Sequence, residues 1–277
     1  MAKWLITGAG SGLGLALTKV VLAAGGQVAG LVRRPESAAE VEALAPGRAR
    51  SFIADMRDAA AVRAAVEAAE TALGGLDVLV NNAGYGLIGA VEEASLEEMR
   101  EQFEVNVFAP VIAIQAILPH FRRRRSGHIV NVTSVSGLAA WAGTGVYCGS
   151  KHALEGIGRT LAQELAPLGI KVTNVEPGGM RTDYAGRSMR VTERRIDDYE
   201  ATAHASERIL AQHAGSEAGD PLRIAAAILQ IVDAPDPPVQ LLLGADAVRY
   251  ATQSMAAFQE EFGRWAALSL STGFPES

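Results

Sequence analysis

The fold of this chain follows from the stretch "KWLITGAGSGLGLALTKVVLAAGG" (3–26). It begins with a short apolar run at 3–8, which predicts a buried strand that ends in glycine. Apolar residues then recur at helical spacing over 13–26, and a double glycine ends the pattern. A strand, a glycine-rich turn and a helix in this order favour an α/β fold.

The same alternation continues to residue 244. Further strands are expected over 27–32, 49–55, 76–84, 127–134, 170–179 and 239–244, and helices over 37–44, 58–75, 95–121, 144–168 and 221–233. The strands are continuous apolar runs, which is typical of strands buried on both faces of a parallel sheet. We therefore predict a single α/β domain over 1–244, with a doubly wound seven-stranded parallel sheet and helices on both faces, the Rossmann fold.

Two segments depart from this alternation. Residues 180–220 are polar and weakly periodic, although 190–210 could form a helix with a charged face. Residues 245–277 follow the last strand, and 245–268 is predicted to form an amphipathic helix. We expect 245–277 to be a helical extension of the same domain.

Composition narrows the class of protein. The chain has 277 residues, of which 49% are hydrophobic and 20% charged, as in a soluble globular protein. The formal net charge of −6 gives no reason to expect nucleic acid as a partner. The one cysteine, Cys148, excludes an intramolecular disulfide and a multi-cysteine zinc site. No His, Cys, Asp and Glu residues have metal-ligand spacing, so no catalytic metal is predicted.

The sequence also bears on location. No apolar run approaches the roughly 18 residues that a membrane helix needs. The first residues, "MAKWLITGAG", lack the long apolar region of a signal peptide. We expect a cytoplasmic protein with no membrane partner.

The glycines at 8, 12 and 14 lie between the first strand and the first helix. They would let the backbone turn tightly and approach a pyrophosphate, which the free N–H groups of the helix N-terminus would bind. The alternative is a glycine-rich turn without a ligand. The position of the turn, after the first strand of a doubly wound fold, favours a dinucleotide.

A second stretch, "GVYCGSKHALEG" (145–156), places Tyr147 and Lys151 four residues apart on one helix face. A free phenol has a pKa of about 10 and is a poor base at neutral pH. A neighbouring ammonium lowers that pKa, so Tyr147 could exchange a proton with a substrate oxygen. The alternative is a solvated helix surface.

Further motifs follow in order: "NNAG" (81–84), Asn106 in "FEVNVFAP", Ser134 in "NVTSVSG" and "EPGGMRTD" (176–183). With "TGAGSGLG" (7–14) and Tyr-x-x-x-Lys, they make the chain resemble the short-chain dehydrogenase/reductase family over about 3–244. The resemblance implies an oxidoreductase that interconverts a carbonyl and a secondary alcohol by hydride transfer. Its substrate would be a small-molecule carbonyl or alcohol.

The resemblance also implies roles for single residues. Asn106, Ser134, Tyr147 and Lys151 would be catalytic, with Tyr147 as general acid/base and Ser134 bonded to the substrate oxygen. Lys151 would hold the ribose hydroxyls and, with Asn106 through water, sustain a proton relay. The predicted cofactor contacts are Thr7, Gly8, Ser11, Gly12, Leu13, Gly14, Arg33, Arg34, Asp55, Met56, Asn82, Ala83, Gly84, Tyr147, Lys151, Pro177, Gly178 and Thr182.

The end of the second predicted strand, "AGLVRRPES" (29–37), bears on the choice of cofactor. In dinucleotide folds an acidic residue about 20 positions past the glycines binds the 2′-hydroxyl of NAD. Val32 takes that place here, and Arg33 and Arg34 follow it. A guanidinium can bind a 2′-phosphate with two charge-assisted hydrogen bonds. We predict NADP(H), with Ser11 as an added contact and NAD(H) as the alternative; the resemblance implies that Asp55 meets the adenine.

Four loop residues are candidates for the substrate pocket: Tyr85, Trp141, Met180 and Tyr184. They lie beyond strand carboxyl ends, where ligands bind in this architecture, and ordinary loop packing is the alternative. The resemblance places a substrate lid near 184–215, although a fixed helix would suit the same sequence. We expect a homodimer or homotetramer, with the helix after Gly244 packed on a partner subunit. A non-catalytic dinucleotide-binding regulatory protein is a third interpretation, but such proteins usually lose the tyrosine or the lysine.

Overall fold

The computed structural model describes residues 1–182 and 188–274. Its main sheet contains β1 (Lys3–Thr7), β2 (Gln27–Val32), β3 (Ala49–Ile53), β4 (Val78–Asn81), β6 (Gly127–Val132), β7 (Ile170–Pro177) and β9 (Gln240–Leu243). The strands lie in the order β3-β2-β1-β4-β6-β7-β9, and every neighbouring pair is parallel. The chain therefore builds outward from β1 to one edge and from β4 to the other. The predicted doubly wound seven-stranded parallel sheet is confirmed.

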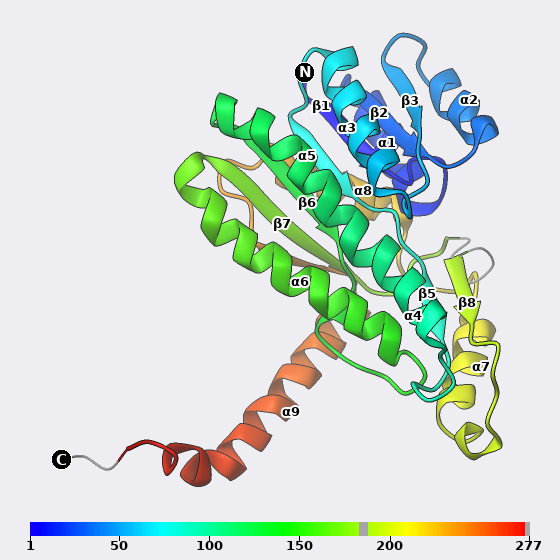
Figure 1. Ribbon diagram of the computed structural model, residues 1–277, viewed down its shortest axis with the longest axis vertical. Helices are drawn as coiled ribbons and strands as arrows, with labels where there is room; N and C mark the ends of the chain where they lie inside the picture. The colour runs from blue at the N-terminus through cyan, green and yellow to red at the C-terminus, as the bar shows by residue number, and fades with distance from the viewer. Residues whose placement is uncertain (183–187, 275–277) are drawn as a thin grey trace.

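Helices cover the sheet in two layers (Figure 1). One layer holds α1 (Gly12–Ala23), α2 (Pro35–Ala43) and α8 (Pro221–Asp233), and the other holds α3 (Ala59–Leu73), α5 (Ala109–Arg124) and α6 (Gly145–Leu165). Side chains of a strand alternate between its faces, so β1 contributes to both cores. Trp4 and Ile6 pack with α1 and α8, whereas Leu5 packs with α3 and α5.

The helical run predicted over 95–121 is more complex than expected. It consists of α4 (Leu96–Phe103), a π-helical turn (Glu104–Phe108) and α5, and Ser95 and Glu98 form a capping box at its start. By length and composition the run 96–124 could cross a membrane, with a mean hydropathy of 1.3. A buried core helix passes the same test. Ile117 and Phe121 of α5 are fully buried among residues of α3 and α6, which accounts for the apolar character of this run.

A second, two-stranded sheet pairs β5 (Gly86–Ile88) with β8 (Met189–Val191). The sequence does not predict it, and the helix expected over 190–210 is wrong in its first half. That segment forms β8, a short 3-10 turn and then α7 (Ala203–His213). Two strands of three residues carry no measurable periodicity, and their pairing depends on contacts distant in sequence. Thr192, just after β8, lies very close to Gly89, just after β5. A β-carbon added to Gly89 would lie 2.1 Å from the Oγ1 of Thr192.

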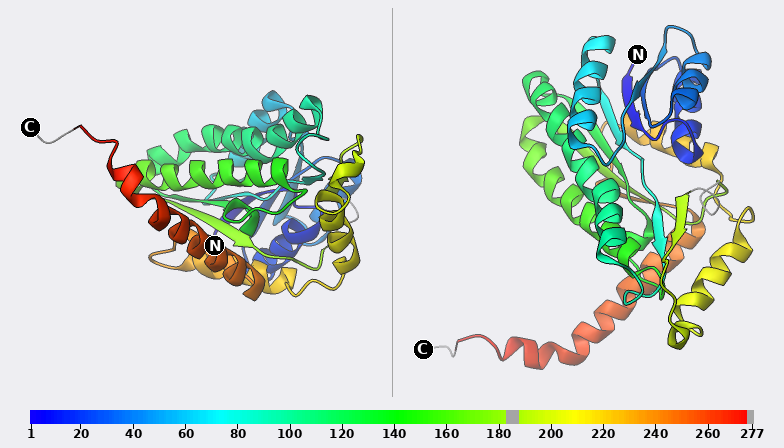
Figure 2. Two further views of the ribbon diagram at one scale, coloured as in Figure 1. Left: turned by 90° about the horizontal axis from the view of Figure 1, so that it is seen from below. Right: turned by 45° about the vertical axis from the view of Figure 1, so that its right-hand side comes forward.

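The predicted C-terminal helix is present as α9 (Ala245–Leu270). Its first turns pack on the sheet domain, where Ala247 and Ala251 are buried against Val135. Every residue over 255–270 is exposed. Figure 2 shows this part of the helix projecting away from the body of the molecule.

Candidate active site

The glycine loop has the geometry that a dinucleotide requires. Gly8 and Gly12 have φ angles of +69° and +50°, which disfavour residues with a β-carbon. A β-carbon on Gly14 would lie 2.3 Å from the carbonyl oxygen of Gly8, so only glycine lets the helix pack this close to the strand. Ser11 takes the N-cap position of α1 but makes no side-chain cap. The first N–H groups of α1 are therefore available to a phosphate.

Thr7 joins the ends of β1 and β4, the two strands between which the winding of the sheet reverses. Its Oγ1 accepts hydrogen bonds from the backbone N–H groups of Asn82 and Ala83, both at 2.9 Å. The Nδ2 of Asn82 donates in return to the carbonyl oxygen of Thr7 at 2.8 Å. These bonds fix "NNAG" beside the glycine loop, at the crevice where doubly wound folds bind ligands.

Tyr147 and Lys151 lie on one face of α6. The Lys151 Nζ is 5.8 Å from the centre of the Tyr147 ring and donates to the carbonyl oxygen of Val132 at 2.9 Å. Lys151 is buried, whereas Tyr147 is partly exposed. Burial lowers the pKa of Lys151 to about 8, although the Glu155 carboxylate one turn further along α6 acts to raise it. The geometry sets a buried ammonium beside a phenol that solvent and substrate can reach.

Asn106 lies within the π-helical turn, a feature often found at functional sites. Its Oδ1 accepts from the backbone N–H of Tyr85 at 3.1 Å, and its Nδ2 donates to the Tyr85 carbonyl at 2.9 Å. The Nδ2 also lies 3.1 Å from the Oγ of Ser150, which donates to the carbonyl of Tyr147. A β-carbon on Gly84 would stand 3.1 Å from Asn106 Oδ1 and 3.6 Å from Lys151 Nζ. Gly84 therefore lets these two side chains approach the end of β4.

Ser134 follows β6 and precedes a 3-10 turn (Val135–Gly137). Its Oγ accepts from the backbone N–H of Ser136 at 3.0 Å, and the side chain is partly exposed. The turn packs tightly on α6, since a β-carbon on Gly137 would lie 3.2 Å from the Lys151 carbonyl oxygen. The structure thus brings the end of β6 against the helix that carries Tyr147 and Lys151.

A chain of buried amides leads from the strand ends to α6. Asn81 donates to Asn131 at 2.9 Å, and Asn131 donates to Asn174 at 3.0 Å, across β4, β6 and β7. Asn174 donates to Glu155 Oε1 at 2.7 Å. Glu176, also buried, has its pKa raised well above the usual range, first by burial and then by the neighbouring Glu155 carboxyl. The Glu176 carboxyl is therefore neutral near pH 7.

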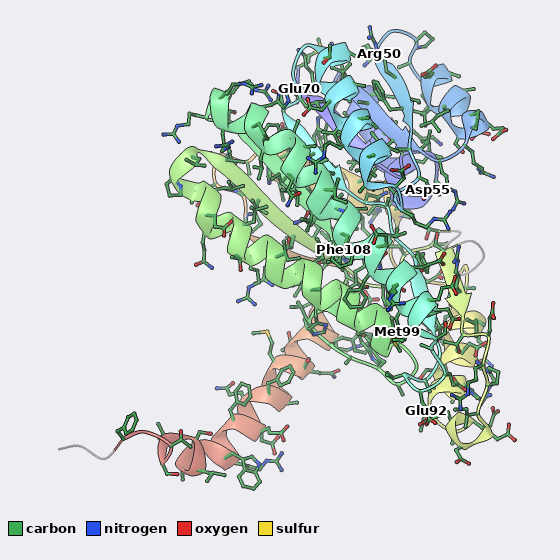
Figure 3. The ribbon with its side chains drawn as sticks, viewed as in Figure 1. Arg50, Asp55, Glu70, Glu92, Met99 and Phe108 are labelled. Atoms are coloured by element: carbon green, nitrogen blue, oxygen red, sulfur yellow. The ribbon has the colours of Figure 1, made fainter. Side chains whose placement is uncertain are left out.

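The residues predicted to meet the adenosine half lie at the ends of β2 and β3. Val32 is buried, and Arg33 and Arg34 are exposed immediately after it. Figure 3 shows Asp55 just beyond β3. The hydrogen bond from Arg57 lowers the pKa of Asp55 to about 2, with a smaller contribution from Arg33. The Arg57 Nη2 is 2.7 Å from Asp55 Oδ2, so Arg57 and Arg33 both act on the carboxylate at this edge.

The "EPGG" segment reaches the glycine loop from the other side. Pro177 ends β7, and a β-carbon on Gly178 would lie 2.3 Å from Asp246 Oδ1. Asp246, in the first turn of α9, accepts from the backbone N–H of Gly179 at 2.8 Å. Thr182 lies opposite Gly12, since an added β-carbon there would be 3.8 Å from the Thr182 β-carbon. Thr182 therefore lies beside the first residue of α1.

Three further cofactor candidates are Ser11, Leu13 and Met56. Leu13 is buried in the first turns of α1, Ser11 is exposed before it, and Met56 packs at the edge of the core beside α3.

The four pocket candidates have different surroundings. Tyr85 is held through its backbone by Asn106, and the guanidinium of Arg190 stacks 4.9 Å from its ring. Trp141 contacts Tyr250 of α9 edge-on, with ring centres 5.3 Å apart. Met180 forms a bridge with Gly219 and packs against the α1-side core. Tyr184 lies outside the described residues.

The described part of the expected lid is tied to the body by polar contacts. His204 of α7 is buried, with Nε2 2.7 Å from Glu93 Oε1 and Nδ1 3.0 Å from Glu200 Oε2. Arg190 of β8 pairs with Glu101 of α4 at 2.9 Å. Tyr199 donates to Glu92, which Figure 3 shows beside the α7 end of the molecule.

Several functional features do not follow from the sequence. The acidic pair Glu155 and Glu176 and the loop contact of Asp246 join residues far apart in the chain. The pairing of Arg57 with Asp55 could have been predicted, because "DMR" places an acid and a base two residues apart. Within the described residues, no group of three or more His, Cys, Asp and Glu could hold a metal ion.

Comparisons with known proteins agree with this geometry. A family model described as short chain dehydrogenase matches residues 3–192. The chain is 37% identical to oxidoreductase BOA17 of Botryotinia fuckeliana, covering 97% of this chain and 98% of that protein. It is 36% identical over 190 residues to an NADPH-dependent 3-dehydrocapnine reductase of Ornithobacterium rhinotracheale, covering 66% and 67%. A crystal structure of a short-chain dehydrogenase from Streptomyces avermitilis matches with a TM-score of 0.92 and 36% identity, covering 98% of both chains.

Proposed function

Because this chain belongs to the short-chain dehydrogenase family, we propose that it interconverts a carbonyl and a secondary alcohol with NADP(H), using Tyr147 as general acid/base. The observation that carries the proposal is the buried Lys151 ammonium, 5.8 Å from the ring of the accessible Tyr147. The site fits a dinucleotide, because the loop at Gly8, Gly12 and Gly14 has positive φ angles and close contacts that only glycine tolerates. When bound, the cofactor supplies or accepts the hydride.

In the reducing direction, Ser134 donates a hydrogen bond to the carbonyl oxygen and orients it toward Tyr147. Tyr147 then donates its phenolic proton to that oxygen as the carbonyl carbon receives the hydride. The resulting phenolate is stabilised by the Lys151 ammonium, which favours the charged form of the tyrosine. Reprotonation of the phenolate completes the cycle. The oxidising direction runs through the same groups, with Tyr147 as the base.

Lys151 and Asn106 hold this arrangement in place. Lys151 is fixed by its bond to the Val132 carbonyl, and Asn106 bridges the start of β5 and the backbone of α6 through Ser150. These contacts fix the helix that carries Tyr147 beside the end of β6. A precisely held acid is worth about 10²–10⁴ in rate.

The preference for NADP(H) rests on Arg33 and Arg34, which follow the buried Val32 where NAD enzymes of this architecture carry an acid. A relative that is 36% identical is an NADPH-dependent reductase, which supports the same choice. Arg57 adds a third positive charge near this edge, although Asp55 offsets it.

The experiment is a nicotinamide absorbance assay with a panel of ketones and aldehydes, and with secondary alcohols for the reverse direction. We expect turnover of at least one carbonyl class, with higher kcat/KM for NADPH than for NADH. Tight dinucleotide binding with no turnover across the panel would favour a regulatory binding protein. A higher kcat/KM for NADH would show that the arginines do not select the cofactor.

A further inference from the structure

The outer part of α9 has an apolar face that no other described segment covers. Over 255–270 every residue is exposed, including Phe258 (52%), Phe262 (69%) and Trp265 (59%). Isolated helices of a few turns are marginal in water, and Gly263 weakens this one by about 1 kcal/mol relative to alanine. This part of α9 therefore needs to pack against another protein surface or a lipid surface to be stable.

The uncovered face continues the face that packs on the body. On the helix, Ala247, Ala251 and Ser254 point toward the sheet domain, where the first two are buried and Ser254 donates to the Leu138 carbonyl at 2.9 Å. Steps of three and four residues carry the same stripe outward to a second group: Met255, Phe258, Phe262 and Trp265. One continuous stripe thus packs on the sheet domain at its N-terminal end and is exposed to solvent at its C-terminal end.

The spacing of the residues in the stripe indicates which kind of surface covers it. Met255, Phe258, Phe262 and Trp265 follow one another by three, four and three residues. This is the spacing of a coiled-coil seam, which packs against another helix. A surface-bound helix at a lipid interface is instead rich in lysine and arginine. Over 255–270 the charged residues are Glu260, Glu261 and Arg264, so anionic lipid would be repelled rather than attracted.

We propose that α9 pairs with α9 of a second copy of this chain, in an antiparallel two-helix seam that forms a symmetric dimer. A self-complementary patch is what a twofold interface requires. A parallel pair would bring both bodies to the same end of two helices only about 8–10 Å apart, whereas an antiparallel pair separates them. In that register Phe258 faces Phe262 of the partner subunit, and Met255 faces Trp265 of the partner subunit.

The area supports a specific though modest interface. Aromatic side chains bury about 150–250 Å² each, and the three in this stripe are more than half exposed. With Met255 and Leu268, the stripe offers roughly 500 Å² per copy, or about 1,000 Å² for the pair, near the lower bound for specific association. The register also brings the end of the partner helix beside Tyr250, which packs on Trp141 at the turn after Ser134. Pairing would thereby reach the rim of the active site.

The test measures the mass of the full-length protein by light scattering at micromolar concentration. We compare the wild type with Phe262→Glu, which charges the seam, and with Ala256→Glu, which adds the same charge on the opposite face of α9. We expect the mass of the Phe262→Glu variant to fall to half that of the wild type and the mass of Ala256→Glu to stay unchanged. A monomeric wild type, or an unchanged mass for Phe262→Glu, would overturn the proposal.

Two further measurements fix the partner and the register. Mixed Met255→Cys and Trp265→Cys proteins should form a disulfide-linked dimer on oxidation, while Met255→Cys alone should not. A cross-link from Met255→Cys alone would overturn the antiparallel register. Sedimentation of a monomeric wild type with phosphatidylcholine vesicles would assign the stripe to a membrane and overturn the pairing.

Discussion

The polar side chains at and beside the carboxyl ends of β1, β4 and β6, including those from the π-helical turn and α6, are held differently from those of residues 188–213. Thr7, Asn106 and Lys151 are buried, and each bonds to backbone atoms of another element. In the outer segment, Arg190 and Arg208 pair with carboxylates at the surface. Exposed ion pairs contribute about 0–1 kcal/mol, whereas a buried polar group left unpaired costs about 1–3 kcal/mol. The reacting groups are therefore fixed by the fold, while the surface ion pairs of the outer segment can be altered with little loss of stability.

The largest expected effect tests this division directly. Tyr147→Phe removes one hydroxyl and leaves the ring, so it should lower kcat by about 10³-fold, within the range for a positioned general acid. Cofactor affinity should change little, because Lys151 and the glycine loop remain. The measurement is kcat from the absorbance assay together with the dissociation constant of NADPH from fluorescence.

The matched control is Tyr199→Phe, which removes the same hydroxyl from the outer segment, where it donates to Glu92. Its kcat and KM should equal those of the wild type within about twofold. If Tyr147→Phe retained full turnover, or if both variants were equally damaged, the contrast between the two regions would be lost.

The next effect concerns the cofactor edge, which shares features of both regions. Arg33 and Arg34 are exposed, yet they follow the buried end of β2. Replacing both with alanine should lower the ratio of kcat/KM for NADPH to that for NADH by about 10–100-fold, since a charge-assisted bond is worth about 1.5–3 kcal/mol. Arg122→Ala, at the other end of the molecule in the last turn of α5, should leave the ratio unchanged. A ratio unmoved by the double variant would remove the arginines from cofactor choice.

The same contrast explains what the sequence could and could not predict. The seven strands and the helices that cover them follow from apolar runs and helical spacing, which are local properties. Ser134, Tyr147 and Lys151 follow from short motifs because their positions are set by strand ends and one helix turn. The structure places Lys151 and Asn106 beside Gly84 at the end of β4, and the roles that the family resemblance implies for these residues stay predictions.

The features that the sequence does not predict depend on contacts between distant parts of the chain. β5 and β8 have three residues each, too few for a period, and they pair across a hundred residues or so. The π-helical turn at Asn106 has the same residue types as an α-helix. Glu155 and Glu176 meet only because the register of β7 faces the second of them toward α6. The sequence predicts a helix over 245–268, but it does not show at which residue that helix leaves the body.

A smaller effect is expected from the buried carboxyl pair behind Lys151. Burial holds the pKa of Lys151 at about 8, and the Glu155 carboxylate acts to raise it. Glu155→Gln removes that charge, so the ammonium should be lost at lower pH. The alkaline limb of the kcat profile should therefore move down by about one pH unit, a shift typical of one partly shielded charge.

Glu176→Gln is the control for this change. The raised pKa of Glu176 keeps its carboxyl neutral near pH 7, so glutamine mimics the form already present. Its kcat should match the wild type up to about pH 7, where Glu176 is neutral in the wild type as well. A profile of Glu155→Gln that coincides with the wild type would show that Lys151 does not sense this pair.

The smallest effect concerns His204, a buried polar group that ties α7 to the body. Hydrogen bonds first to Glu93 and then to Glu200 raise the pKa of His204, although Arg195 acts in the opposite direction. Because the pKa of His204 is raised in the folded state, the stability that protonated His204 provides is complete below the unfolded pKa of about 6.5. It is lost as pH rises through the folded pKa. Burial acts to raise the pKa of Glu93, but the Ala90 N–H and His204 lower it to about 2, so Glu93 stays ionised throughout.

Hydrogen exchange should detect the loss. After correction for intrinsic rates, amides of α7 should lose protection as pH rises above the unfolded value of about 6.5 and through the raised pKa of His204, whereas those of α6 should not. His204→Gln keeps a polar side chain but no titrating charge, so its α7 protection should be lower and independent of pH over the same window. Equal pH dependence of α7 and α6 would show that protonation of His204 does not stabilise α7. Residues 188–213 would then be held by their surface ion pairs alone.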